Sequence, residues 1–128
     1  MQYLASRDSM CHVDEISEKM GIPQSFLRKI LQRLVTARIV LSHRGFAGGF
    51  SLARSADDIN LLEIMEAVDG QLFFNPCLKP EPSESACMLD HNCSLQRAWS
   101  IAQIAFKQAL SSRTLRSLTT VEVPTAIR

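Results

Sequence analysis

The stretch that decides the fold is GIPQSFLRKILQRLVTARIVLSHRGFAGGFSLAR, residues 21–54. Its first half predicts a helix, because Pro23 suits a first helical turn, where its missing N–H costs nothing, and apolar residues follow at helical spacing. We expect these apolar residues to face the core: Phe26, Leu27, Ile30, Leu31, Leu34 and Val35. The outer faces are then polar and basic, with Gln24, Ser25, Arg28, Lys29, Gln32 and Arg33.

A shorter helix is predicted just before this one. Val13, Ile16 and Met20 recur at helical spacing, and Gly21 then ends the helix. Two short helices joined at a glycine are typical of a helix-turn-helix.

The second half of the stretch predicts a β-hairpin. Two short apolar segments, Ile39–Leu41 and Phe50–Leu52, flank a glycine-rich tip with a basic residue at its base. A hairpin after a helix-turn-helix makes a winged helix, in which the second helix enters the major groove and the wing lies along the backbone or minor groove of DNA. The sequence therefore predicts a mainly α fold with a small β-hairpin wing.

The candidate DNA contacts follow from this geometry. Side chains near the amino-terminal end of the second helix reach base edges, where an arginine can form two hydrogen bonds with a guanine. Arg44, at the root of the wing, suits a narrow minor groove, and glycines allow close approach of the backbone. The alternative is that the polar side chains of the helix only form a solvated face, but the adjacent wing favours DNA binding. The predicted contacts are Gln24, Ser25, Arg28, Lys29, Gln32, Arg44, Gly45 and Gly48.

Two further helices are predicted after the hairpin. Asn60 can cap a helix that stops at Gly70, with an apolar face of Leu61, Leu62, Met65 and Val68. Beyond Cys93 a helix of about five turns carries one apolar stripe and needs a partner surface; Thr114 can cap a last short turn with Leu115 and Leu118. The stripe consists of Leu95, Ala98, Trp99, Ala102, Ala105, Phe106, Ala109 and Leu110.

Charge is distributed unevenly along the chain. The net charge of +1 divides into +4 for residues 1–54, −7 for residues 55–93 and +4 for residues 94–128. A basic amino-terminal half can supply the electrostatic part of nucleic-acid binding, because neutralised phosphates release counterions.

The composition is that of an ordinary soluble globular chain, with 128 residues and 46% hydrophobic content. No apolar run approaches the roughly 20 residues that a membrane-spanning helix needs, and the amino terminus does not have the layout of a signal peptide. We therefore expect a cytoplasmic protein without a membrane partner. No nucleophile, base and orienting group occur at a suggestive spacing, so an enzyme is not expected.

Three of the four cysteines lie between Gln71 and Cys93, where helical periodicity disappears and prolines indicate an irregular loop. Nine residues separate Cys77 from Cys87, and five separate Cys87 from Cys93. In a reducing compartment such thiols indicate metal or redox chemistry rather than disulfides, and iron-sulfur clusters are held mainly by cysteine thiolates.

Alternatives to a cluster on these three cysteines stay open. They are a cluster-free loop, a zinc site and an electron-transfer protein, although the last would leave the wing without a purpose. Cys11, beside His12, suggests an activated thiolate, but no orienting third group is evident, so we expect a buried or incidental thiol.

At these residues the chain resembles the Rrf-type winged-helix regulators, which include IscR, NsrR and RirA, over nearly its whole length. RGFAGGFSLAR resembles the family's wing, INLLEIMEAVDG its linking helix, GIPQSFLRKILQRL its recognition helix and CSLQRAWSIAQIAF the start of its dimerisation helix. The resemblance implies a homodimer on a palindromic operator. It also implies four regions: the winged helix-turn-helix, whose first helix is shortened (1–58), the linking helix (59–70), the cluster loop (71–93) and the dimerisation helix with the tail (94–128).

The resemblance further implies a sensor. In the family's sensing members three cysteines precede the dimerisation helix, which implies that Cys77, Cys87 and Cys93 hold a [2Fe-2S] or [4Fe-4S] cluster. The Cys77 to Cys87 spacing is longer than in IscR and NsrR. Where IscR has a fourth ligand, a histidine, this chain has Gln96. The acidic fourth ligand of NsrR has no counterpart at the amino terminus of this chain. The candidates for a fourth ligand are Asp90, His91, an outside thiol and water.

Together these observations predict a transcriptional regulator, a repressor by preference, that senses redox state, nitric oxide or iron through a labile cluster. The alternative is a winged-helix regulator that responds to another signal without any metal.

Overall fold

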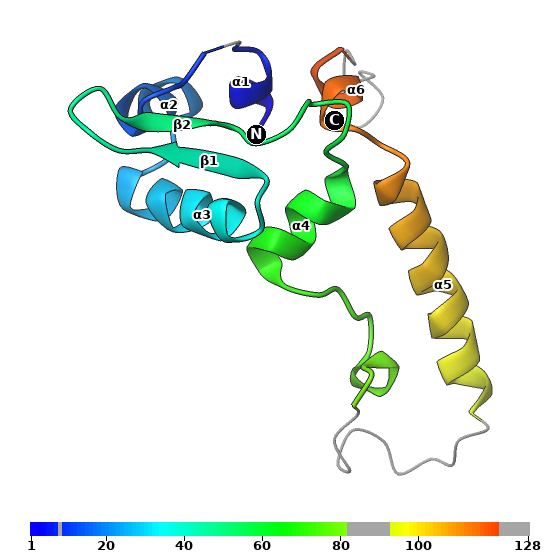
Figure 1. Ribbon diagram of the computed structural model, residues 1–128. Helices are drawn as coiled ribbons and strands as arrows, with labels where there is room; N and C mark the ends of the chain where they lie inside the picture. The colour runs from blue at the N-terminus through cyan, green and yellow to red at the C-terminus, as the bar shows by residue number, and fades with distance from the viewer. Residues whose placement is uncertain (8, 82–92, 121–128) are drawn as a thin grey trace.

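The computed structural model describes residues 1–7, 9–81 and 93–120 of the chain (Figure 1). The elements are α1 (Gln2–Ala5), α2 (Val13–Met20), α3 (Gln24–Thr36), β1 (Val40–His43), β2 (Gly49–Leu52), α4 (Leu61–Asp69), the short 3₁₀ helix η1 (Pro76–Leu78), α5 (Ser94–Ser111) and α6 (Leu115–Thr120). The predicted mainly helical fold with a small antiparallel hairpin is confirmed.

Helices α2 and α3 form the predicted helix-turn-helix. Gly21 has a φ of +63°, a left-handed conformation that glycine adopts without the usual steric penalty. The Ile22 N–H donates to the Ser17 carbonyl (3.1 Å), which closes the end of α2. The turn between the two helices is therefore set by residues next to it in the chain.

The buried face of α3 is narrower than the sequence predicts. Leu27, Leu31 and Leu34 are buried, and Ile30 is half-buried. Phe26 was expected in the core, but 58% of it is exposed. It lies on the same side as Ile30, at the edge of the buried face and one turn nearer the end of the helix, where less of the protein covers it.

The hairpin pairs β1 with β2 antiparallel, with Val40 opposite Leu52 and His43 opposite Gly49. The segment before α2 extends this sheet by one bridge. The Cys11 N–H donates to the Phe50 carbonyl (2.9 Å), and the Phe50 N–H donates to the Cys11 carbonyl (2.8 Å). Two hydrogen bonds thus attach the helix-turn-helix to the base of the wing.

The hydrophobic core combines residues from both ends of the described chain. Its largest fully buried members are Leu34, Ile39, Ile59, Leu115, Val40 and Cys11. Helix α6 returns to the amino-terminal unit: the Leu115 N–H donates to the Ile59 carbonyl (2.7 Å) and the Gln2 side chain to the Leu118 carbonyl (3.1 Å). Although the sequence assigns α6 to the carboxyl-terminal region, α6 packs with the winged helix-turn-helix.

Helix α4 begins with the predicted cap. The Asn60 side chain accepts a hydrogen bond from the Glu63 N–H (2.9 Å), and the Glu63 carboxylate accepts one from the Asn60 N–H (3.0 Å). This reciprocal capping box satisfies two backbone donors. Of the predicted apolar face only Val68 packs against the core; Ile64 and Ala67 complete that contact, while Leu61, Leu62 and Met65 are half-buried elsewhere.

Helix α5 runs down one side of the molecule, beside α4 and η1 and away from α3 and the hairpin (Figure 1). Its 18 residues make about five turns. None is buried, and a mostly polar row that includes Gln96, Gln103 and Lys107 faces the rest of the chain. The residues of the predicted apolar stripe are exposed except Leu110, which is half-buried. None of the helices in the described ranges is long and apolar enough to cross a membrane.

Candidate nucleic-acid interface and cysteine segment

The outer face of α3 presents the polar residues that the sequence singled out. Leu27, Leu31 and Leu34 attach the helix to the core on its other side. This burial orients α3 and leaves five of the predicted contacts exposed: Gln24, Ser25, Arg28, Lys29 and Gln32. Two of these are cations, which suit phosphates and guanine edges.

Arg33 has a different position from its neighbours. Its Nη1 donates to the carbonyl of Val68 in the last turn of α4. A cation at the carboxyl end of a helix is favourable, because the carbonyls there carry partial negative charge. Arg33 therefore links α3 to α4.

The wing has the backbone that its glycines predict. Gly45 has a φ of +111°, and the Gly48 N–H donates to the Gly45 carbonyl (3.0 Å). A Cβ atom on Gly48 would lie 2.4 Å from the His43 carbonyl oxygen, so no larger residue fits that turn unless the backbone moves. Arg44 and Gly45 are exposed, and Gly48 is half-buried.

A notch between α3 and the wing brings predicted contacts from both elements together. It has a volume of ≈350 Å³, and its lining includes Arg28, Gly45 and Gly48. The same notch is lined by His12 and His43, which the sequence analysis did not select. Both are separated from Arg28 by 15 or more positions, so no local motif could have identified them.

The wing tip carries another residue that sequence reasoning missed. Phe46 is fully exposed. Exposed apolar side chains at such positions are used by some proteins to contact or unstack bases in the minor groove. The signal that could have found it is an aromatic residue beside the glycines of a predicted hairpin tip.

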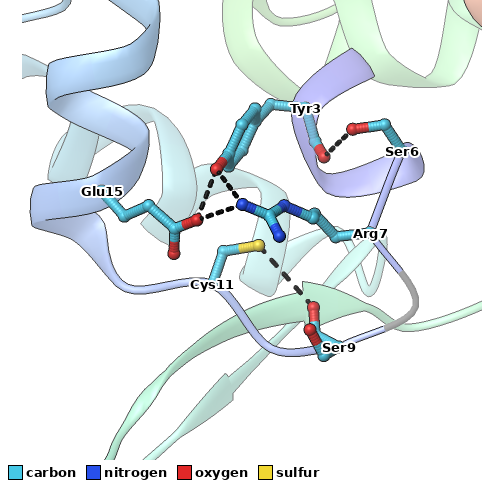
Figure 2. Close-up of polar contacts among 6 residues, drawn as sticks. All are labelled: Tyr3, Ser6, Arg7, Ser9, Cys11 and Glu15. Atoms are coloured by element: carbon cyan, nitrogen blue, oxygen red, sulfur yellow. Dashed lines mark hydrogen bonds and ion pairs between the residues drawn. The ribbon is translucent and has the colours of Figure 1, made fainter.

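A polar cluster stabilises the amino-terminal side of the helix-turn-helix (Figure 2). Arg7 Nη2 lies 2.7 Å from Glu15 Oε1 and 2.9 Å from Tyr3 Oη, and the Tyr3 hydroxyl also donates to Glu15. The Tyr3 hydrogen bond, assisted by the charge of Arg7, lowers the pKa of Glu15 below its ordinary value. The cluster thereby joins α1 to α2.

Cys11 lies against this cluster as a buried thiol. It is 1% exposed, and its Sγ donates to the Ser9 carbonyl (3.6 Å) (Figure 2). Burial, with a smaller effect from Glu15, raises the pKa of the Cys11 thiol. A protonated, enclosed thiol is a poor nucleophile, which confirms the expectation of a buried cysteine and not an activated thiolate.

The cysteine segment, residues 71–93, is described at residues 71–81 and at Cys93. These parts meet the amino-terminal end of α5. Cys93 is the residue before the first turn of α5, and Cys77 lies in η1; both are half-buried and free. Gln96 Nε2 donates to the Cys77 carbonyl (3.0 Å). The residue at the position of the histidine ligand of IscR thus attaches η1 to the turn of α5 that follows Cys93.

The donors in this segment fit an iron-sulfur cluster in their chemistry, since both are thiols. Cys87, Asp90 and His91 lie outside the described residues. Within the ranges 1–7, 9–81 and 93–120, no group of three or more His, Cys, Asp or Glu side chains could hold a metal ion. The described part of the chain therefore supplies two of the predicted ligands.

Aromatic and charged contacts connect the cysteine segment to α4 and α5. The Phe74 ring meets those of Trp99 (6.3 Å between centroids) and Phe106 (5.3 Å), so both rings of α5 have an intramolecular partner besides their predicted role at a dimer interface. Lys107 Nζ lies 3.0 Å from Glu66 Oε1 in α4. Together with Arg33 and Gln96, these contacts connect η1 to α3 through α5 and α4.

Comparison with known proteins agrees with this structure. Residues 1–120 match the sequence profile of the Rrf2 family, described as "Iron-dependent Transcriptional regulator". The HTH-type transcriptional regulator NsrR of Oceanobacillus iheyensis is 28% identical over 115 residues, which cover 90% of this chain and 77% of that protein.

Two solved structures share the fold. T. potens IscR matches with a TM-score of 0.70 and 21% identity, covering 99% of this chain and 87% of that one. CymR, the global cysteine regulator of B. subtilis, matches with a TM-score of 0.72 and 20% identity, covering 95% of this chain and 91% of that one. The predicted winged-helix fold is thereby confirmed.

Proposed function

This chain belongs to the Rrf2 family of transcriptional regulators, and from that premise we propose that it is a cytoplasmic, homodimeric repressor whose operator affinity is set by an iron-sulfur cluster. Membership makes it a DNA-binding regulator and not an enzyme. The cluster, the dimer and a palindromic operator are the parts that we add. The ligands that we propose are Cys77, Cys87 and Cys93.

The observation that carries the DNA-binding part is the notch between α3 and the wing. Arg28 comes from the recognition helix, and Gly45 and Gly48 come from the wing, yet all three line one hollow of ≈350 Å³. We propose that α3 enters the major groove through Gln24, Ser25, Arg28, Lys29 and Gln32. Arg44 with the wing then follows the adjacent minor groove.

A substitution at the notch tests this interface. After selection of the operator from a random duplex library, Arg28→Ala should weaken operator binding about 5- to 150-fold, because one bidentate contact to a base is worth about 1–3 kcal/mol. Arg113→Ala is the matched control, since it removes an exposed arginine that lies outside the notch. Equal affinity of the Arg28 variant and the wild type would contradict the proposed interface.

The sensing part is supported by the hydrogen bond from Gln96 in α5 to the Cys77 carbonyl, because Cys93 is the residue just before α5. The family description also includes the words iron-dependent. A cluster held there would supply a centre that responds to oxygen, nitric oxide and iron supply. The protein would connect this centre to α3 through three contacts. Gln96 joins η1 to α5, Lys107 and Glu66 join α5 to α4, and Arg33 joins α4 to α3.

Purification without oxygen tests the sensor. Visible absorption together with iron and acid-labile sulfide assays should detect a cluster, and Cys93→Ser should lose it. Cys11→Ser is the control, because Cys11 is buried in the core (1% exposed) and does not belong to the cysteine segment. A colourless, iron-free wild-type protein that still binds its operator would contradict the cluster.

A second candidate is a regulator of the same fold that responds to a different signal without metal. It is favoured by the likeness to a protein described as a cysteine regulator. Such a protein would bind its operator equally well before and after treatment with an iron chelator.

A further inference from the structure

A cavity behind the wing collects arginine side chains from three separate segments. It has a volume of ≈370 Å³ and lies between the α1–α2 connection, the hairpin, the segment after β2 and the start of α6. This volume falls within the range of about 300–1,000 Å³ in which small-molecule sites occur. Its polar lining includes Arg7, Arg54, Arg116, His43, Ser51 and Ser55.

Each arginine is held from outside the cavity by a carboxylate. Arg7 pairs with Glu15 (2.7 Å), Arg54 pairs with Glu63 (3.2 Å), and Arg116 pairs through Nε with Asp57 (3.6 Å). None of these three carboxylates belongs to the lining, which contains no acidic residue among the described ones. The ion pairs therefore hold the guanidinium groups in place from outside the lining, and each carboxylate offsets part of the charge that its arginine presents to the cavity.

The hydrogen-bonding groups of the lining are mostly donors. Arg116 meets Asp57 through Nε, which carries one of the five N–H donors of a guanidinium group. Ser51 shares a hydrogen bond of 2.8 Å with His43 Nε2, so a ligand that contacts one affects the other. Guanidinium groups bind phosphate and carboxylate oxygens in two-pronged geometry, and charge-assisted hydrogen bonds are stronger than neutral ones.

We propose that this cavity is a binding site for a phosphate oxyanion. Two sources share that chemistry, a small phosphorylated molecule and a backbone phosphate of DNA beyond the α3 notch. His43 lines both the cavity and the notch, so the two sites share one residue. An anion in the cavity contacts α6 and the wing at once and links the end of the chain to the DNA-binding unit.

Inorganic phosphate and the full chain, without DNA, provide the first test. Isothermal titration and thermal unfolding should detect phosphate binding beyond that of sodium chloride at the same ionic strength. Arg116→Gln should weaken it at least about tenfold, as expected for the loss of a charge-assisted contact. The variant should fold normally, because the Arg116–Asp57 pair is more than half exposed, and Arg113→Gln serves as the matched control. No binding above chloride, or equal binding by Arg116→Gln, overturns the proposal.

The second arm identifies the source. If duplex DNA displaces phosphate and Arg116→Gln weakens duplex binding, the cavity takes a DNA phosphate. If phosphate binds equally with and without DNA, the ligand is a small molecule. The phosphate titration stays readable even if the chain binds no operator, so failure of the proposed function and failure of this site are distinguishable.

Discussion

The cysteines of this protein have contrasting surroundings. Cys11 is enclosed in the core, where burial raises its pKa, whereas Cys77 in η1 and Cys93 just before α5 are half-buried. Since the thiolate is the reactive form, brief treatment of the native apo protein with iodoacetamide should alkylate Cys93 and Cys77 well before Cys11. Peptide mass spectrometry measures the order. In denaturant the difference should disappear; an early modification of Cys11 in the native protein would contradict its enclosure.

Glu15 connects α2 to α1 through Tyr3 and Arg7, and this connection depends on pH. The Tyr3 hydrogen bond, followed by the Arg7 charge, lowers the pKa of Glu15 in the folded chain. A lowered pKa contributes stability above the unfolded-state pKa and loses it as the pH falls through the folded-state value. Glu15→Gln should therefore destabilise the protein at neutral pH, and the difference from wild type should shrink below about pH 4.

Urea unfolding at several pH values checks this. Glu18→Gln is a suitable control, because Glu18 is exposed on the same helix. A stability difference for Glu15→Gln that is independent of pH would mean that the charge of Glu15 contributes nothing.

At the scale of the elements, α5 is the part of the molecule that most needs a partner. Its exposed side chains include Leu95 (60% exposed), Ile101 (65%) and Ile104 (53%), with Trp99 and Phe106 each 39% exposed. Ile101 and Ile104 lie on the opposite flank of the helix from Leu95, Trp99 and Phe106, and exposed alanines of the predicted stripe lie between the two flanks. Exposed apolar surface of this kind marks an interaction surface. We infer that a second copy of α5 covers them, in agreement with the predicted homodimer.

Ile101→Glu should therefore convert a dimer into a monomer, because a charge replaces apolar area at the interface. Analytical ultracentrifugation over a concentration series measures the change. If the Ile101 variant remains as dimeric as the wild type, the dimer uses another surface.

At the scale of the whole molecule, the cysteine segment and the recognition helix are connected by contacts between side chains. Gln96 bonds the Cys77 carbonyl, Lys107 pairs with Glu66, and Arg33 bonds the end of α4. The Lys107–Glu66 pair is 29% exposed at each side chain, so it is less screened than a surface pair.

Glu66→Gln should therefore reduce the difference in operator affinity between the cluster-loaded and cluster-free protein. Coupling free energies of about 1–3 kcal/mol are typical, so the wild-type ratio is expected to be about 5- to 150-fold and that of the variant several-fold smaller. Anaerobic mobility shifts measure both ratios. An unchanged ratio in the variant would remove this ion pair from the coupling.

The sequence alone determined the features that depend on neighbouring residues. The turn at Gly21, the cap at Asn60 and the hairpin around its glycines were predicted because caps and turns involve residues within a few positions of one another. The exposure of the polar face of α3 was predicted for the same reason, since helical periodicity alone separates Arg28 from Leu27 and Leu31.

Only the tertiary structure decided which surface each element meets. The exposure of Phe26 and of most of the apolar stripe of α5, and the return of α6 to the amino-terminal core, depend on contacts between segments far apart in the chain. His12 and His43 line the same notch as Arg28 for the same reason. Periodicity shows that a helix has two faces, but the neighbour that covers one face is selected by the packing of the whole molecule.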